Sequence, residues 1–233
     1  MSEIVASTKD SPGAMESRKQ WQPAELPATS PVWSWPPRPL TVLKYLFGYP
    51  GYLLPWNAII ALIVVTAWFY TQPELSRMAE FRVDWIAQIY VRNLALLVLF
   101  AGGMHLWLYT IKGQGTRHKF SPKWLGGKSP TFLGGTQLRD NIFWSVASGC
   151  TVWTVYEALM MWAYANGTLA TVDWSADPVY FAGLLGLLMM WHVTHFYFGH
   201  RLLHWKPLYR SAHYLHHKNV NIGPWSGLSM HPI

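Results

Sequence analysis

Histidine is concentrated at the C-terminal end of this 233-residue chain, where eight of its ten histidines fall within the last 42 residues. Neutral imidazole is the commonest metal ligand in proteins, and imidazoles at regular spacing are typical of a metal site. The crowding therefore predicts metal chemistry in this part of the chain. The eight residues are His192, His195, His200, His204, His213, His216, His217 and His231.

Two groups of these histidines have helical spacing. His200 and His204 are four residues apart, so on a helix they share one face and can reach one metal ion or two adjacent ones. His213 repeats the pattern with His216 and His217. Adjacent residues on a helix diverge, so His216 and His217 require different metals, or one of them contacts a ligand instead of the metal. Five histidines in so short a stretch favour a two-metal site over one tetrahedral zinc.

The composition favours a membrane protein over a soluble one. Only 12% of the residues are charged, about half of the ~25% usual in soluble domains. Aromatic residues make up 16% of the chain, and the mean hydropathy is +0.10. Such a chain has too few charges to cover its surface in water; the alternative is a set of buried helices in a large soluble α-protein.

The apolar residues form four segments of the length that a bilayer requires, roughly 20 residues for ~30 Å of hydrocarbon. The chain is therefore predicted to be all-α, a multi-pass transmembrane helical protein. Arg92 lies near one end of the second segment, from where its side chain can extend to the membrane interface. The segments cover about residues 52–70, 86–111, 142–165 and 179–198.

The distribution of charge predicts the orientation. The loop at 112–140 has six basic residues and one acid, and the tail at 199–233 has four basic residues and no acid. Basic loops face the cytoplasm, so both termini are expected there, in a bacterial inner membrane or the endoplasmic reticulum. Anionic headgroups would hold much of the net charge of +7, and no separate basic patch indicates a nucleic-acid partner.

Three regions follow from this organisation. Residues 1–40 are polar and proline-rich and are predicted to be a flexible N-terminal arm. Residues 41–198 form the transmembrane region, and residues 199–233 form an incomplete cytoplasmic histidine-box segment. Within the last region, Pro207 is expected to separate two short helices.

Several titratable residues in or near the apolar segments have open roles. We call His200 and His204 the first histidine box, and His213, His216 and His217 the second. His192 and His195 precede both boxes at the membrane edge, where they either bind metal directly or support it from the interface. His105 either bonds a neighbouring helix or lines a lipid tunnel, and His118 is expected on the surface. Glu157, the lone acid of the third segment, faces a polar cavity or has a hydrogen-bonded structural role.

The box residues resemble a known family. The stretches F-Y-F-G-His200-R-L-L-His204-W and L-Y-R-S-A-His213-Y-L-His216-His217-K, followed by S-M-His231-P, are similar to the fatty acid hydroxylase/sterol desaturase superfamily. Its members are membrane enzymes that hold a non-haem di-iron centre on cytoplasmic histidines. The resemblance covers roughly residues 180–233, and the four predicted spans agree with it.

The resemblance implies an activity and a ligand set. The activity is hydroxylation or desaturation of a sterol or fatty acyl lipid, with molecular oxygen and two electrons from a donor protein of the cytochrome b5 or ferredoxin type. No catalytic residue is implied beyond the ligands of the two irons. Four basic residues beside the box either anchor the tail or hold headgroups or an acidic donor: Arg201, Lys206, Arg210 and Lys218. The implied ligands are His200, His204, His213, His216, His217 and His231.

The sequence departs from the family pattern at its end. The histidine corresponding to His231 normally opens a Pro-x-Glu-His motif, and a final H-x-x-H-H box follows. Here the sequence stops at Ile233. We therefore expect either the N-terminal portion of a longer enzyme or a short product with an incomplete di-iron site, without independent activity.

A second class of function is compatible with part of the pattern. A haem- or metal-binding membrane protein without oxidase activity can use His105 with His192 or His195 as a haem pair, but this leaves the five box histidines unexplained. A zinc protease is disfavoured, since the chain has no H-E-x-x-H motif and no acid after Asp177.

Overall fold

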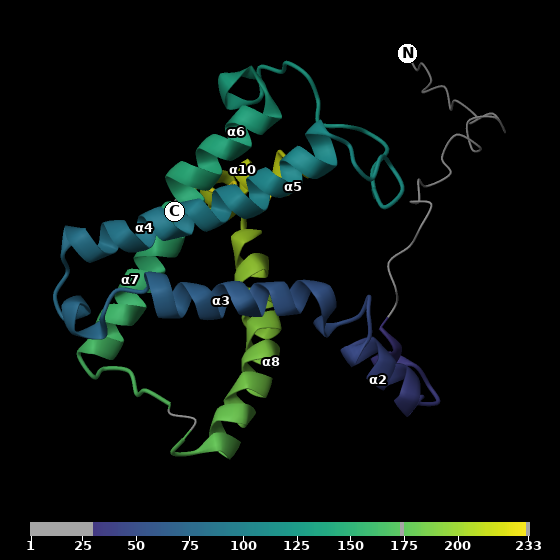
Figure 1. Cartoon of the computed structure of the whole chain (residues 1–233). Helices are drawn as coiled ribbons and strands as arrows, with labels where there is room; N and C mark the ends of the chain where they lie inside the picture. Colours follow the sequence, from purple (N-terminus) through teal and green to yellow (C-terminus); the bar gives the residue numbers. More distant parts are fainter. Residues whose placement is uncertain (1–29, 173–174, 232–233) are drawn as a thin grey trace, which may run out of the picture.

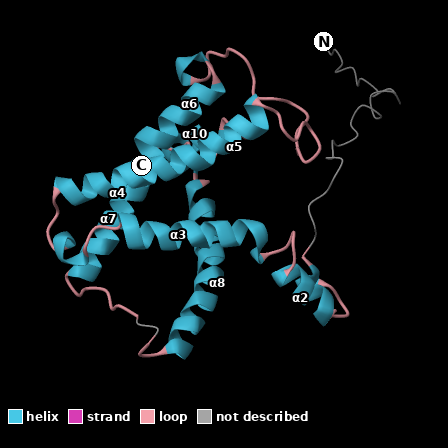
Figure 2. Cartoon of the chain, viewed as in Figure 1, coloured by secondary structure: helices cyan, strands magenta, loops and turns pink. Residues whose placement is uncertain are grey.

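The structure is a computed structural model that describes residues 30–172 and 175–231. The described residues form helices and loops and contain no strand (Figure 2), which confirms the prediction of an all-α class. Most of the predicted N-terminal arm, residues 1–29, lies outside the described residues. The remainder of that arm contains a 3₁₀ turn, Pro31–Trp33, and the start of helix α2.

The helices follow the predicted apolar segments. Wide π-helical turns connect α4 to α5 and α6 to α7, so each pair forms one long rod. The helices are α2 (Pro39–Phe47), α3 (Ala58–Thr71), α4 (Val83–Leu97), α5 (Gly103–His105), α6 (Gln137–Trp144), α7 (Thr151–Ala165), α8 (Pro178–Leu203), α9 (Lys206–Leu208) and α10 (Tyr214–His217) (Figure 1).

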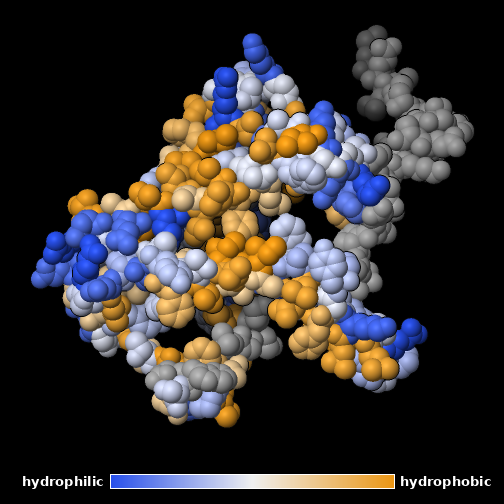
Figure 3. Space-filling view, in the orientation of Figure 1, coloured by the Kyte–Doolittle hydropathy of each residue, from blue (hydrophilic) through white to orange (hydrophobic). Residues whose placement is uncertain are grey.

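Two helical stretches are long and apolar enough to cross a membrane. They are Leu53–Thr71, of 19 residues, and Val83–Thr110, of 28 residues. At 1.5 Å per residue the shorter one extends about 28 Å, close to the thickness of a bilayer core. Apolar side chains cover much of the molecular face seen in Figure 3, while hydrophilic residues gather toward loops and helix ends. Helices also occupy the third and fourth predicted segments, at α6–α7 and α8.

Helix α8 joins the fourth predicted apolar segment to the first of the two short helices expected after it. We expected the fourth segment to end near residue 198, but the helix continues to Leu203 and includes His200. No helix breaker occurs before Pro207, which lies in the first turn of α9, where a missing N–H costs no helical hydrogen bond. The predicted break near Pro207 is confirmed.

Two buried apolar clusters hold the rods together. Met78, Trp85 and Met161 belong to the first, which joins α4 to α7. The second contains Cys150 and also Trp225, which comes from the chain after the histidine boxes. The C-terminal segment therefore packs against the α4–α5 and α6–α7 rods (Figure 1).

The contact between that segment and the third predicted span is close. The Ser145 hydroxyl donates a hydrogen bond to the Trp225 carbonyl at 2.7 Å. A Cβ at Gly149 would lie 2.5 Å from the Leu228 carbonyl oxygen. Only glycine allows the two backbones to approach in this way.

A buried polar network crosses between α4 and α7. The Arg92 guanidinium pairs with the Glu157 carboxylate and donates to Gln72 Oε1 at 2.5 Å. Asn93 Nδ2 donates to Glu157 Oε2 at 3.2 Å and to Thr154 Oγ1 at 3.3 Å. Arg92 therefore turns inward to an opposite charge, instead of extending to the interface as predicted. Glu157 has the hydrogen-bonded role, one of the two that the sequence left open.

Candidate metal centre

Four histidines from two separate segments converge at the end of α8. His200 and His204 come from the end of α8, while His213 and His217 come from a π-helical turn, η8 (Tyr209–His213), and from α10. One ring nitrogen from each lies within 4.8 Å of those from the other three. The helical spacing of each pair thus places both of its imidazoles on one face, as predicted.

The distances fit the donors of one metal ion. Nε2 of His200 lies 3.1 Å from Nε2 of His204, and Nε2 of His213 lies 3.0 Å from Nε2 of His217. The two pairs face each other, with ring centroids 4.7 Å apart for His200 and His213 and 4.8 Å apart for His204 and His217. Four nitrogens at ~2.1 Å from a tetrahedral metal would be about 3.4 Å apart. Within each pair the nitrogens are slightly closer than this, and across the group they lie up to 4.8 Å apart, so the four imidazoles could hold a metal ion if the two pairs approach each other.

Tyr209 supports three of these rings and is a site residue that the sequence did not single out. Its ring stacks on His204 at a centroid distance of 5.7 Å and lies 6.2 Å from His213 and 5.7 Å from His217. The sequence feature that could have indicated Tyr209 is its position in the Leu-Tyr dipeptide between His204 and His213. Tyr209 thus forms an aromatic wall beside the four imidazoles.

Burial favours the neutral form of His213, the buried member of the second pair. His213 is buried, and desolvation, followed by the nearby His217 and His200, lowers its pKa to about 4. Desolvation is also the main cause that lowers the pKa of His217. A metal ligand must be deprotonated, so these shifts prepare the two rings to bind metal at neutral pH.

The lowered pKa of His213 predicts that the metal-free protein loses stability in acid. Its imidazole has a pKa of 6.5 ordinarily and about 4 in the fold, so the unfolded state binds more protons between these values. The stability that His213 contributes is fully present above pH 6.5, the ordinary pKa, and is lost as the pH falls toward about 4, the pKa in the folded state. Thermal unfolding in detergent should show a lower Tm at about pH 5 than at about pH 7.5. The His213→Gln variant should show a smaller difference, and equal differences would contradict the assignment.

The structure leaves two of the six implied ligands outside the group. The His216 ring lies at 85° to the His217 ring and faces the backbone of Ser229, while its Nδ1 is buried without a hydrogen-bond partner. This agrees with the expected divergence of adjacent residues. His231 packs against Trp144, with ring centroids 5.9 Å apart.

The remaining histidines of the apolar segments stack on aromatic neighbours. His192 lies on Phe196 and His195 on Trp191, both within α8, and His105 lies on Tyr109. Among the described residues, none of these three belongs to the four-histidine group.

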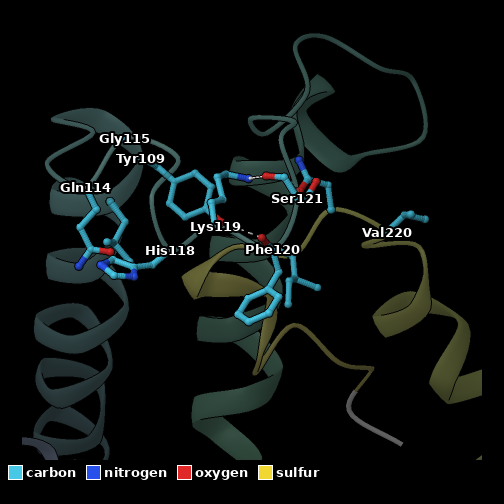
Figure 4. Close-up of a pocket in the computed structure, with 11 residues that line it drawn as sticks. Tyr109, Gln114, Gly115, His118, Lys119, Phe120, Ser121 and Val220 are labelled. Carbon is cyan, nitrogen blue, oxygen red and sulfur yellow. Dashed lines mark hydrogen bonds between the residues drawn. The ribbon is translucent and has the colours of Figure 1, made fainter. Parts of the chain in front are cut away.

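A separate cavity of about 390 Å³ lies beside the segment that follows the boxes (Figure 4). The 112–121 loop and residues 220–222 form its walls, and none of the four clustered histidines lines it. Lys119 Nζ donates to the Ser121 carbonyl at 2.7 Å, and the Tyr109 hydroxyl donates to the Ile222 carbonyl at 2.8 Å. The Asn221 amide also donates to the carbonyls of Lys123 and Trp124, which joins the basic middle loop to the chain after His217.

Comparisons with protein-family models, with curated proteins and with solved structures each find no match for this chain.

Proposed function

We propose that this chain belongs to a membrane-bound, histidine-ligated, iron-dependent lipid oxidoreductase of the fatty acid hydroxylase/sterol desaturase type. The observation that supports this most is the convergence of His200, His204, His213 and His217 from the two stretches whose motifs resemble that family. In this proposal α3, α4–α5, α6–α7 and α8 are the four spans. The metal centre then lies at the cytoplasmic end of α8, with both termini on that side.

The proposed reaction needs an oxidant derived from metal-activated dioxygen, because a methylene C–H bond is too inert for acid–base catalysis. Bound iron would supply the activation of dioxygen, with electrons from a donor protein of the cytochrome b5 or ferredoxin type. The four histidines hold the metal, and burial of His213 keeps that ligand neutral. The exposed apolar surface of α8, including Phe196 and Trp191, orients a sterol or fatty acyl chain and excludes water from the centre.

The number of irons is a distinct part of the proposal. The four gathered imidazoles fit one ion, and a second iron needs further donors. Under the resemblance these include His216 and His231, which lie outside the group here. His216 Nδ1 is a buried nitrogen without a partner, so it is the more suitable of the two for a second ion.

The basic tail is proposed to contact an acidic electron donor or lipid headgroups. Arg201, Lys206 and Arg210 are exposed. Lys218 is paired with the buried Asp140, so we remove it from this docking set. Molecular oxygen and a membrane lipid are the remaining partners, and no nucleic acid is proposed.

Metal analysis and absorption spectroscopy of the detergent-purified chain test this function. We expect iron in at least equimolar amount without a Soret band, because four imidazoles suit several first-row metals and the family uses iron. Reconstitution with zinc alone and with iron alone serves as the control for metal preference. A Soret band would favour the haem alternative, and stoichiometric zinc without iron would support a metal-binding protein without oxidase activity.

A further inference from the structure

The chain that follows the second histidine pair is attached to the start of α6 by a buried ion pair. Lys218 directly follows His217, and its Nζ lies 2.7 Å from Asp140 Oδ1. The Asp140 side chain is fully buried, and that of Lys218 is 9% exposed. The same carboxylate oxygen accepts a hydrogen bond from the Leu133 N–H at 2.9 Å. Asp140 thus connects α6, the loop before it and the end of the second box.

A second set of hydrogen bonds lies one helical turn away. Gln137 Nε2 donates to Asn219 Oδ1 at 3.1 Å and to the Asn221 carbonyl at 2.7 Å. The Asn221 amide donates in turn to the carbonyls of Lys123 and Trp124, at 3.1 and 2.9 Å. We call the Asp140–Lys218 pair and the Gln137 contacts with Asn219 and Asn221 the α6 anchor.

The second histidine pair needs such an anchor. His213 and His217 lie on a five-residue π turn and a four-residue helix, which are far too short to be stable alone. Their position therefore depends on tertiary contacts. The first pair lies on the 26-residue α8, which packs mainly against α9 and η8. Contacts of α8 therefore do not attach the second pair to the α4–α5 and α6–α7 rods.

We propose that the α6 anchor is a positioning device for the metal centre. It holds His213 and His217 where the imidazoles of His200 and His204 meet them, and so it increases the affinity of the site for metal. Neither Asp140 nor Lys218 belongs to the four-histidine group; both would act through the backbone of α10. This inference rests on the proposed metal site, although not on its oxidase activity.

Cobalt binding tests the proposal, because Co²⁺ reports affinity and ligand geometry in its d–d absorption. The double variant Asp140→Asn/Lys218→Met leaves no charge buried without a partner. In detergent, we expect its Kd for Co²⁺ to rise roughly 10-fold, the lower end of the effect of supporting groups around metal ligands. Its d–d bands should also shift. Lys218→Arg, which keeps the ion pair, should bind nearly as the wild type does.

The matched control is Lys128→Met, which removes an exposed basic residue of the middle loop and should leave the Kd unchanged. Gln137→Ala weakens the anchor without altering charge and should raise the Kd by a smaller factor, so it serves if the double variant fails to fold. Wild-type protein that binds no Co²⁺ would refute the metal site itself. Wild-type affinity in the folded double variant or in Gln137→Ala would refute the anchor alone.

Discussion

Replacing His204 with alanine should abolish tight metal binding while leaving membrane insertion intact. The His204 ring is close to all three others, with centroids 4.9 Å from His200, 4.9 Å from His213 and 4.8 Å from His217. Three imidazoles would remain, and one coordination position would pass to water. We expect the Kd for Co²⁺ to rise at least about 100-fold, beyond the 10- to 100-fold effect of losing a supporting group. Under the proposed function, this variant should form no product.

The contrast with His216 makes this experiment sharper. The family resemblance predicts that His216→Ala also abolishes product, whereas the His216 ring lies outside the four-histidine group. We therefore expect His216→Ala to retain the first metal ion and to lose only a second one. The exposed His118 in the middle loop is the control, and its alanine variant should bind metal normally. Iron content and turnover retained in His204→Ala would overturn the ligand assignment.

The largest effect on stability is expected from Glu157→Leu. This change leaves the Arg92 guanidinium, whose side chain is only 10% exposed, buried without its carboxylate. Removing one partner of a buried ion pair costs about 3–5 kcal/mol. Reversible unfolding of the metal-free protein in mixed micelles measures this loss. The double variant Arg92→Met/Glu157→Leu removes both charges and should recover most of it.

A surface ion pair provides the control for this measurement. Arg77 Nη2 lies 3.1 Å from Asp84 Oδ2 where the α3–α4 loop meets α4, and the two side chains are 45% and 43% exposed. Arg77→Met should therefore cost less than about 1 kcal/mol. The network would not hold α4 to α7 if Glu157→Leu lowered the free energy of unfolding no more than Arg77→Met does. The same conclusion would follow if the double variant were no more stable than Glu157→Leu.

The helical architecture could be predicted because it depends on local composition. A long apolar segment has few ways to satisfy its backbone polar groups away from water, and a helix does so within the segment itself. The first two predicted segments coincide with Leu53–Thr71 and Val83–Thr110 for this reason. Helix α8 continues past the predicted apolar segment, since hydropathy marks where apolar residues stop, whereas a helix continues until its backbone is interrupted.

The fate of Arg92 and Glu157 could not be predicted in the same way. They are 65 residues apart in the chain, and each taken alone is compatible with an interfacial or structural role. Only the packing of α4 on α7 brings the two charges together. Lys218 is a similar case. As a basic residue of the tail it indicated a docking surface, whereas in the fold it pairs with Asp140, 78 residues away in the chain.

By itself, the sequence determined that His200 and His204 share a face, since helix geometry is local. It left His213 with two neighbours at helical spacing, His216 and His217. Only the tertiary structure decided that the two pairs meet, that His216 turns toward Ser229, and that α6 holds the second box in place. Those outcomes depend on the turn after α8 and on contacts between residues distant in sequence, and such contacts leave no periodic signal in the chain.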